Sequence, residues 1–233
     1  MSKVFIVPDV HLKPWMFEKA SELISEDSYD AVVFLGDLVD DWHQERNIDL
    51  YKKTFDAAIS FAGKHPNTFW CFGNHDVSYL WEAMETGYSF YARETVVTGI
   101  KDLKESLPKE NFGFVHVIDN VVFSHAGLTQ KFISRHFSTG KTDLDTMVSR
   151  INMMDERELW TDDSPIWARP QYGDMKLFSN DIYQVVGHTP VSTVLDEGNL
   201  LTLDTFSTYS DGRPIGDERF VWFDTIERTW KQL

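Results

Sequence analysis

The stretch TFWCFGNHD, residues 68–76, passes from an apolar run to polar side chains without a spacer. The apolar part is typical of a buried strand, and Gly73 after it is typical of the turn at a strand end. Asn74, His75 and Asp76 follow directly. Turn chemistry accounts for the glycine and the asparagine, but it gives no reason for an imidazole. We therefore expect a binding or catalytic role at this strand end.

The same pattern precedes this stretch twice. Two further apolar runs, VFIVPD (4–9) and AVVFLGD (31–37), also end in an aspartate. Residues 15–26 and 46–64, between the runs, carry apolar side chains at three- and four-residue spacings, which predicts helices. The order strand–helix–strand–helix–strand predicts right-handed crossovers and a largely parallel opening sheet.

The second half of the chain has shorter apolar segments. FGFVHVIDNVVFSHAG (112–127) predicts a hairpin, residues 77–111 predict helical and irregular structure, and residues 129–160 predict a polar helical stretch. Short strands are also expected in YQVVG, VSTVL, NLLTLD, RFVWFD and TWKQL, at residues 183–187, 191–195, 199–204, 219–224 and 229–233. These elements predict an α/β fold: a layered α/β/β/α sandwich of mixed sheets flanked by helices.

Length and composition predict a single domain over residues 1–233. Hydrophobic residues make up 42% of the chain, which is enough for a substantial core and excludes a disordered protein. No apolar run approaches the roughly 18 residues of a membrane-spanning helix, and the chain starts without the apolar stretch of a secretory signal. The single cysteine, Cys71, excludes an internal disulfide and fits a reducing compartment. We therefore expect a cytoplasmic protein with no membrane partner.

The charge limits the partners further. A net charge of −15 argues against an extended nucleic-acid-binding face. Surplus carboxylates at strand ends are, in contrast, what a site for hard cations requires. The sequence does not indicate the oligomeric state.

Five predicted strand ends carry side chains that bind metals or transfer protons. Asp9 and His11 end the first strand, and residues two apart in a strand share a face, so the carboxylate and the imidazole converge. The donors at the other strand ends are Asp37, Asp40, Asn74, His75, His125 and His188. Each is ordinary turn chemistry alone. Together they predict one site at the rim where open α/β sheets bind ligands.

The ordered motifs DVH (9–11), GDLVD (36–40), GNHD (73–76), SHAG (124–127) and VGH (186–188) resemble those of the calcineurin-like metallophosphoesterase superfamily. The resemblance extends over nearly the whole chain. SHAGL (124–128), PIWARP (165–170) and VGHTP (186–190) are similar to the bacterial-type serine/threonine protein phosphatases and to their relatives, the symmetrical dinucleoside tetraphosphatases. Many phosphodiesterases of the superfamily have a second histidine where this chain has Pro190, which favours the phosphatase branch.

The resemblance implies a dinuclear metal site. It assigns Asp9, His11 and Asp37 to the first ion, and Asp37, Asn74, His125 and His188 to the second, with Asp37 bridging. Nitrogen and oxygen ligands without thiolate point to Mn, Fe, Zn, Co or Ni, and Mn is our choice for a bacterial-type enzyme. The implied reaction is attack of a metal-bridging hydroxide on phosphorus, in line with the leaving group.

The resemblance also gives His75 a role. It implies that His75 protonates the leaving group as a general acid, that Asp40 orients His75, and that Asp76 shapes the loop. Arg169 resembles an arginine of the family that grips the phosphate. Asp41 stands where protein phosphatases commonly carry another such arginine, and a carboxylate there repels a phosphate dianion unless a metal or another base offsets it.

Three functions remain open on the sequence. The first is a metal-dependent phosphomonoesterase of the phosphoserine/phosphothreonine protein phosphatase type. The second is a dinucleoside polyphosphate hydrolase, phosphodiesterase or nuclease, which Asp41 favours. The third is an inactive scaffold of the same fold, against which the complete set of ligand positions and His75 argue. The substrate is expected to be a phosphoprotein or a nucleotide.

Overall fold

The computed structural model describes residues 2–137 and 142–233, and it has two mixed sheets. The first sheet contains, in spatial order, β11 (Thr229–Gln232), β10 (Val221–Asp224), β1 (Lys3–Val7), β2 (Ala31–Phe34), β3 (Thr68–Cys71) and β4 (Phe112–Gly113). The second contains β5 (Val115–Ile118), β6 (Val121–Ser124), β7 (Tyr183–Val186), β9 (Leu200–Thr202) and β8 (Leu195–Asp196). β1, β2 and β3 pair in parallel, as predicted; β4 also joins β3 in parallel, and β10 joins β1 antiparallel.

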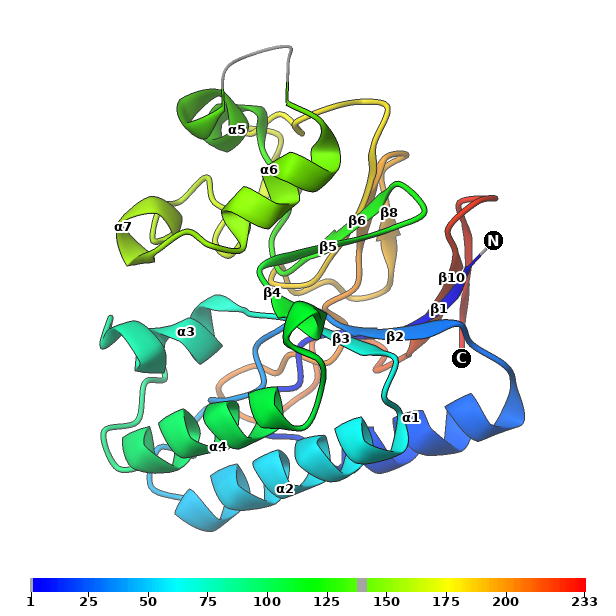
Figure 1. Cartoon of the computed structure of the whole chain (residues 1–233). Helices are drawn as coiled ribbons and strands as arrows, with labels where there is room; N and C mark the ends of the chain where they lie inside the picture. Colours follow the sequence, from blue (N-terminus) through cyan, green and yellow to red (C-terminus); the bar gives the residue numbers. More distant parts are fainter. Residues whose placement is uncertain (1, 138–141) are drawn as a thin grey trace.

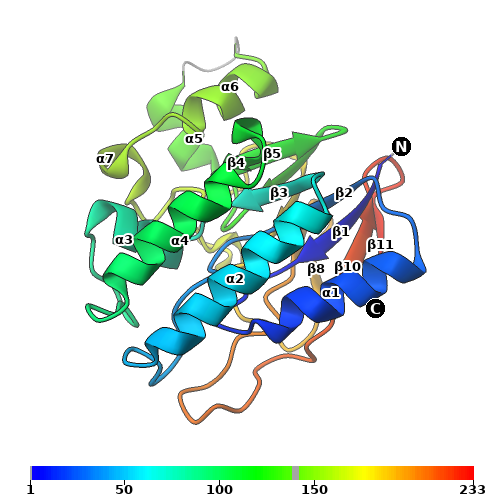
Figure 2. The ribbon, with the colours of Figure 1, turned by 60° about the horizontal axis from the view of Figure 1, so that its bottom comes forward.

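Helices lie outside both sheets (Figure 1). The outer face of the first sheet is covered by α1 (Trp15–Glu26), α2 (Ile48–Lys64) and α4 (Arg93–Glu105), as Figure 2 shows. The second sheet is flanked by α5 (Gln130–His136), α6 (Leu144–Ile151) and α7 (Glu156–Leu159). α3 (Asn74–Trp81) begins where β3 ends, and the short 3₁₀ helices η1 and η2 span Lys109–Asn111 and Pro170–Tyr172. The predicted layered α/β architecture is confirmed.

The central strands are buried on both faces, which explains their uninterrupted apolar runs. In β1, Phe5 and Val7 pack toward the helices, whereas Val4 and Ile6 pack between the two sheets. The helix side is rich in aromatic rings: Phe34 and Trp70 stack with their centroids 3.9 Å apart. Among residues 2–137 and 142–233, no helix combines the length and the apolar character needed to cross a bilayer.

Three predicted segments differ in detail. The hairpin expected over 112–127 begins at β5, because residues 112–113 pair with β3 in the other sheet. At this crossing the Asn152 side chain accepts hydrogen bonds from the backbone of Phe114 (2.7 Å) and Val115 (3.0 Å). Of the strand expected over 191–195, Leu195 alone lies in a strand, at the start of the exposed edge strand β8, and the backbone N–H of Val191 donates instead to the carbonyl of Asp204 at 2.9 Å.

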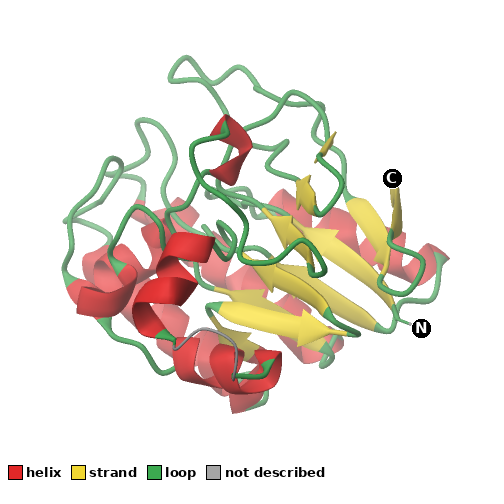
Figure 3. Cartoon of the chain, turned by 90° about the horizontal axis from the view of Figure 1, so that it is seen from above, coloured by secondary structure: helices red, strands yellow, loops and turns green. Residues whose placement is uncertain are grey.

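The helical stretch expected over 129–160 is divided into α5, α6 and α7, and its residues 138–141 lie outside the described part of the chain. The segment 77–111 contains most of α3, then an irregular stretch, then α4. Loops gather beyond the strand ends on one side of the molecule (Figure 3). The side chains predicted to form a site are carried there.

Gly99→Ala is expected to lower the free energy of unfolding by about 1–3 kcal/mol, because overpacking a filled interface forces neighbours to shift. A methyl group at Gly99 would lie 2.6 Å from Cδ1 of Phe55, which is buried between α2 and α4. The matched control is Gly63→Ala in α2, where a methyl group meets nothing within 4 Å. There we expect a gain of up to about 1 kcal/mol from helix propensity. Urea titration measures both; equal effects of the two substitutions would contradict the packing argument.

Candidate metal centre

The loops that carry the site are held in unusual backbone conformations. His11, Asp37, Asp40 and His188 all have positive φ, between 42° and 65°. Such conformations are uncommon for residues other than glycine and persist only where surrounding contacts enforce them. One such contact is the carbonyl of Asp37, which accepts hydrogen bonds from the backbone of Val10 (3.0 Å) and His11 (2.9 Å). The loops after β1 and β2 are thereby joined.

Asp76 joins the loop after β2 to the start of α3. Its carboxylate accepts hydrogen bonds from three buried backbone N–H groups, those of Asp37 (2.9 Å), Leu38 (2.8 Å) and Gly73 (3.0 Å). A Cβ atom at Gly73 would lie 2.8 Å from Cγ of Asp37, so a larger residue does not fit. The geometry agrees with the expected loop-shaping role of Asp76 and explains the glycine that ends this apolar run.

The first group of candidate metal ligands consists of Asp37, His125 and His188, whose ligand atoms lie within 4.8 Å of one another. Nδ1 of His125 donates to the carbonyl of Leu35 at 2.8 Å, because a carbonyl can only accept. Nε2 of His125 then faces Oδ1 of Asn74 at 3.0 Å and Oδ2 of Asp37 at 3.3 Å. Three acceptor atoms therefore converge on one point, which requires a cation or a proton between them.

The electrostatics of this group agree with that requirement. Burial opposes a charge on His125, but the carboxylates of Asp37 and Asp9 and the carbonyl of Leu35 together outweigh it and raise the pKa of His125 to about 9. For Asp37, burial is outweighed by the imidazoles of His125 and His75, which lower its pKa well below the usual range. Nε2 of His188 is buried and has no hydrogen-bond partner among the described residues. Metal ions fit these residues.

The second group of candidate metal ligands consists of His11, Asp37 and His75. Nδ1 of His11 donates to the carbonyl of Asp40 at 2.9 Å, so Nε2 of His11 carries the lone pair and lies 3.8 Å from Oδ2 of Asp37. Asp37 thus belongs to both groups, as the bridging role implied by the sequence requires. Asp9 lies deeper: it is fully buried and accepts the backbone N–H of His188 at 2.9 Å.

His75 and Asp40 lie in contact beside these groups. Nδ1 of His75 is 3.1 Å from Oδ2 of Asp40, whose other oxygen accepts the hydroxyls of Tyr51 (2.7 Å) and Tyr79 (2.6 Å). Burial opposes a charge on His75, but the carboxylates of Asp37, Asp40 and Glu85 raise its pKa well above the usual value. This arrangement can hold a proton on the imidazole.

These residues open into a cavity of about 610 Å³. Of the predicted site residues, His11, Asp37, Asp40, Asn74, His75, His188 and Arg169 line it. Asp9 and His125 lie behind them, fully buried. Nη1 of Arg169 donates to the carbonyl of His188 (3.0 Å) and to the hydroxyl of Thr189 (3.2 Å), which fixes the guanidinium at the wall.

Sequence reasoning missed several residues of the site. Asp204, buried beside Asp9, ends the predicted strand NLLTLD, so the same strand-end signal could have found it. Glu85 contacts Asn74 and His75 but lies in an irregular segment that carries no motif. Lys13 lies 3.6 Å from Asp41, and no local pattern pairs them.

Comparison with known proteins agrees with this geometry. Residues 2–218 match the family model for calcineurin-like phosphoesterases, so the chain belongs to this family. It is a metal-dependent phosphoric ester hydrolase, an assignment that rests on the family match together with the metal-binding chemistry of the site. The chain matches no curated protein sequence.

Solved structures share the fold. A Saccharomyces cerevisiae serine/threonine phosphatase with similarity to human phosphatase PP5 is 16% identical, with a TM-score of 0.55 over 95% of this chain and 72% of that one. A metallophosphoesterase from Sphaerobacter thermophilus is 14% identical, with a TM-score of 0.45 over 100% of this chain and 88% of that one. The first likeness supports the fold; the second is too distant to add to it.

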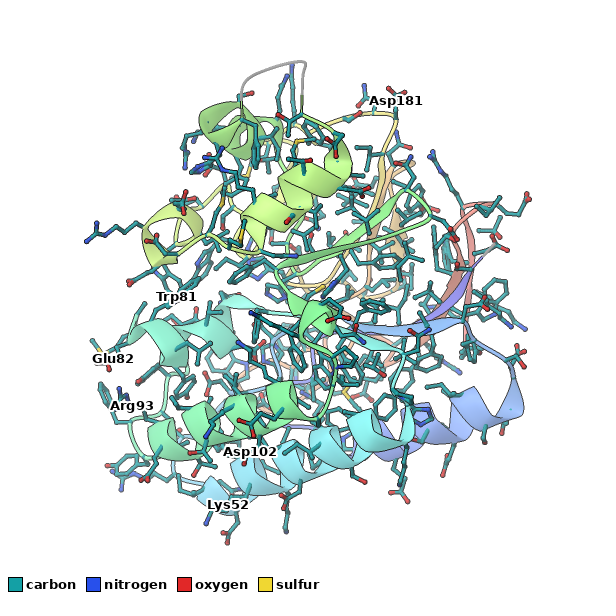
Figure 4. All side chains as sticks on the ribbon, in the orientation of Figure 1. Lys52, Trp81, Glu82, Arg93, Asp102 and Asp181 are labelled. Atoms are coloured by element: carbon teal, nitrogen blue, oxygen red, sulfur yellow. The ribbon has the colours of Figure 1, made fainter. Side chains whose placement is uncertain are left out.

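Asp76→Asn is expected to lower the free energy of unfolding by about 3 kcal/mol or more, because an amide offers one acceptor oxygen where three buried N–H groups need partners. Urea titration of the metal-free protein measures the loss. The control is Asp102→Asn, a carboxylate exposed on α4 (Figure 4), for which we expect less than about 0.5 kcal/mol. A loss no larger than that of the control would show that Asp76 does not organise the loops.

Proposed function

We propose that this protein is a phosphomonoesterase of the serine/threonine protein phosphatase type, which needs two divalent metal ions, most simply Mn²⁺, with Fe, Zn, Co or Ni as the other choices. The observation that carries the proposal is the charge of the cavity wall. Among its lining residues in the described chain, Arg169 is the one arginine or lysine. The carboxylates of the lining are Asp37, Asp40, Asp41, Glu45, Glu85 and Asp204.

This wall favours a substrate with one phosphate. The carboxylates beyond the metal centre repel further negative charges, and among the described lining residues Arg169 is the one arginine or lysine that can offset them. A dinucleoside polyphosphate carries several phosphates next to the one that reacts. A phosphoserine or phosphothreonine side chain carries one phosphate on a neutral backbone, and it is the better match.

The metal ligands we propose are those implied by the sequence: Asp9, His11 and Asp37 for one ion, and Asp37, Asn74, His125 and His188 for the other. When bound, the ions polarise the phosphoryl oxygens and lower the pKa of water, which supplies the nucleophile. The convergence of lone pairs on Asp37 and the unpartnered Nε2 of His188 support this assignment.

His75 is the proposed general acid, and Asp40 its partner. Nδ1 of His75 faces Asp40, so Nε2, for which the described residues provide no hydrogen-bond partner, is free to hold a proton toward the leaving-group oxygen. Two tyrosine hydroxyls saturate the other oxygen of Asp40, which keeps its carboxylate in place. A serine or threonine alkoxide is a poor leaving group and requires this proton.

Arg169 is the proposed phosphate-binding residue. The base that offsets Asp41 is Lys13, whose Nζ lies 3.6 Å from Oδ2 of Asp41, while the hydroxyl of Thr208 donates to Oδ1 at 3.1 Å. With its charge compensated, Asp41 repels a phosphate dianion less than the sequence alone suggests. Position 41 still lacks the arginine that protein phosphatases commonly have there, so binding of the phosphate is left to Arg169 and the metal ions.

The second candidate is hydrolysis of a dinucleoside polyphosphate or a phosphodiester. One observation favours it: Trp42, Tyr88 and Trp167 line the cavity, and aromatic rings stack on nucleobases. The acidic wall of the cavity disfavours substrates with several phosphates, so we consider this second function less well supported than the phosphomonoesterase. We further propose that residues 1–233 act as one domain in the cytoplasm, for which the free, buried thiol of Cys71 is the supporting observation.

The deciding experiment compares initial rates on p-nitrophenyl phosphate, bis(p-nitrophenyl) phosphate and diadenosine tetraphosphate, with Mn²⁺ added back to chelated protein. We expect the monoester to dominate and the rate to vanish without metal. Phosphoserine and phosphothreonine peptides follow as the physiological class. Dominant cleavage of the diester or the dinucleotide would replace the proposal by the second candidate. Bound Mn²⁺ with no turnover of any substrate would favour an inactive scaffold.

His75→Ala is expected to lower kcat by about 10²–10⁴-fold on a phosphoserine peptide, because the alkoxide then leaves unprotonated. The loss on p-nitrophenyl phosphate should be much smaller, since nitrophenolate needs no proton, and the bound Mn²⁺ should stay at the wild-type level. Asp37→Asn is the contrast: it removes charge from both metal groups and should abolish metal binding and all turnover. Equal losses on both substrates for His75→Ala would exclude His75 as the acid.

A further inference from the structure

Glu85 inserts its carboxylate between two neighbouring residues of the site. It lies in the irregular segment after α3, and its side chain is 9% exposed. Oε2 accepts a hydrogen bond from Nδ2 of Asn74 at 2.8 Å, and Oε1 lies 2.9 Å from Nδ1 of His75. Oε1 is buried and forms no hydrogen bond of good geometry with the described residues. The carboxylate thus spans the proposed metal ligand and the proposed acid.

The contact with Asn74 decides which end of the amide faces the metal groups. An asparagine amide has one accepting oxygen and one donating nitrogen, and the two ends exchange by rotation of about 180°. A carboxylate can only accept, so Glu85 selects the orientation with Nδ2 toward itself. Oδ1 of Asn74 is then directed at Nε2 of His125, 3.0 Å away. Without Glu85, the opposite orientation would present a donor to the point where the other ligands present lone pairs.

The contact of Glu85 with His75 adds a second carboxylate beside the imidazole, which already faces Asp40. Oδ1 of Asp40 is occupied by two tyrosine hydroxyls, so one oxygen remains for the imidazole. Glu85 approaches the same nitrogen. Gly87 lies beside the ring, since a Cβ atom added there would be in ordinary contact with Cε1 of His75 at 3.5 Å. Asp40 and Glu85 together therefore restrict rotation of the His75 ring.

We propose that Glu85 is a positioning residue that fixes the Asn74 amide and the His75 ring. It thereby sets the affinity of the metal site that contains Asn74 and the delivery of a proton from His75 to the leaving group. The inference rests on the proposed function, because it takes Asn74 as a ligand and His75 as the acid. Loss of a group that orients a metal ligand commonly costs 10–100-fold in affinity.

The test measures Mn²⁺ binding to the chelated protein by isothermal titration calorimetry, without substrate. Glu85→Ala is expected to weaken the binding of one Mn²⁺ ion, the one held by Asn74, by about 10–100-fold and to leave the binding of the other within about threefold. Glu82→Gln is the matched control, since it removes a carboxylate three positions earlier that instead pairs with Arg93 at the surface (Figure 4). It should leave both events unchanged. Unfolding temperatures verify that each variant is folded.

Glu85→Gln separates the two contacts. Its single amide oxygen can accept from Nδ2 of Asn74, but its nitrogen then meets the protonated Nδ1 of His75, donor against donor. We expect Mn²⁺ affinity within about threefold of wild type, together with a fall in kcat on a phosphoserine peptide at least tenfold larger than that on p-nitrophenyl phosphate. A merely structural role would move the unfolding temperature without this dependence on the leaving group.

The outcomes separate the two levels of the proposal. If wild type binds two Mn²⁺ ions and Glu85→Ala binds both equally well, with unchanged leaving-group dependence, the role of Glu85 is overturned and the proposed function stands. If wild type binds no Mn²⁺ at all, the proposed function falls, and the inference falls with it.

Discussion

The site depends on the position of one carboxylate, that of Asp37. It is shared by the two groups of candidate metal ligands, and it faces Nε2 of His11 at 3.8 Å and Nε2 of His125 at 3.3 Å. Its backbone has a φ of 50° and is held by Asp76, which also binds the start of α3. Displacement of this loop would disturb both groups, because Asp37 is the residue that they share in the described part of the chain. The clamp by Asp76 therefore keeps together what two strand ends and a helix contribute.

Charge compensation explains much of what surrounds Asp37. Asp9, Asp37 and Asp204 are buried near one another, and burial together with Asp204 raises the pKa of Asp9 well above its usual value. Such a cluster destabilises a protein unless cations balance it. At the edge of the cavity Lys13 provides this balance for Asp41. At the centre the histidine and aspartate groups could hold metal ions that provide this balance, which agrees with the family to which the chain belongs.

The sequence predicted the parts of the molecule that follow from local patterns. The apolar runs at 4–9, 31–37 and 68–73 became parallel strands, since strands buried on both faces need such runs. The donors at their ends came together because the ends of parallel strands share one edge. Contacts between distant segments could not be predicted in this way. Glu85 reaches Asn74 from an irregular turn, and Tyr51 and Tyr79 reach Asp40 from two different helices.

Two of the residues that prediction missed, Glu85 and Lys13, have one property in common: they contact and orient side chains of the site rather than bind metal or transfer protons themselves. A ligand or an acid has to be a particular residue type at a strand end, and this leaves a motif. A residue that orients it needs only an acceptor or a donor at the right place, which any nearby segment can provide. Glu85 fits this description, since its oxygens accept from Asn74 and approach His75 from outside every motif. The ligands and the acid can therefore be predicted from sequence motifs, whereas the residues that orient them become apparent only in the folded structure.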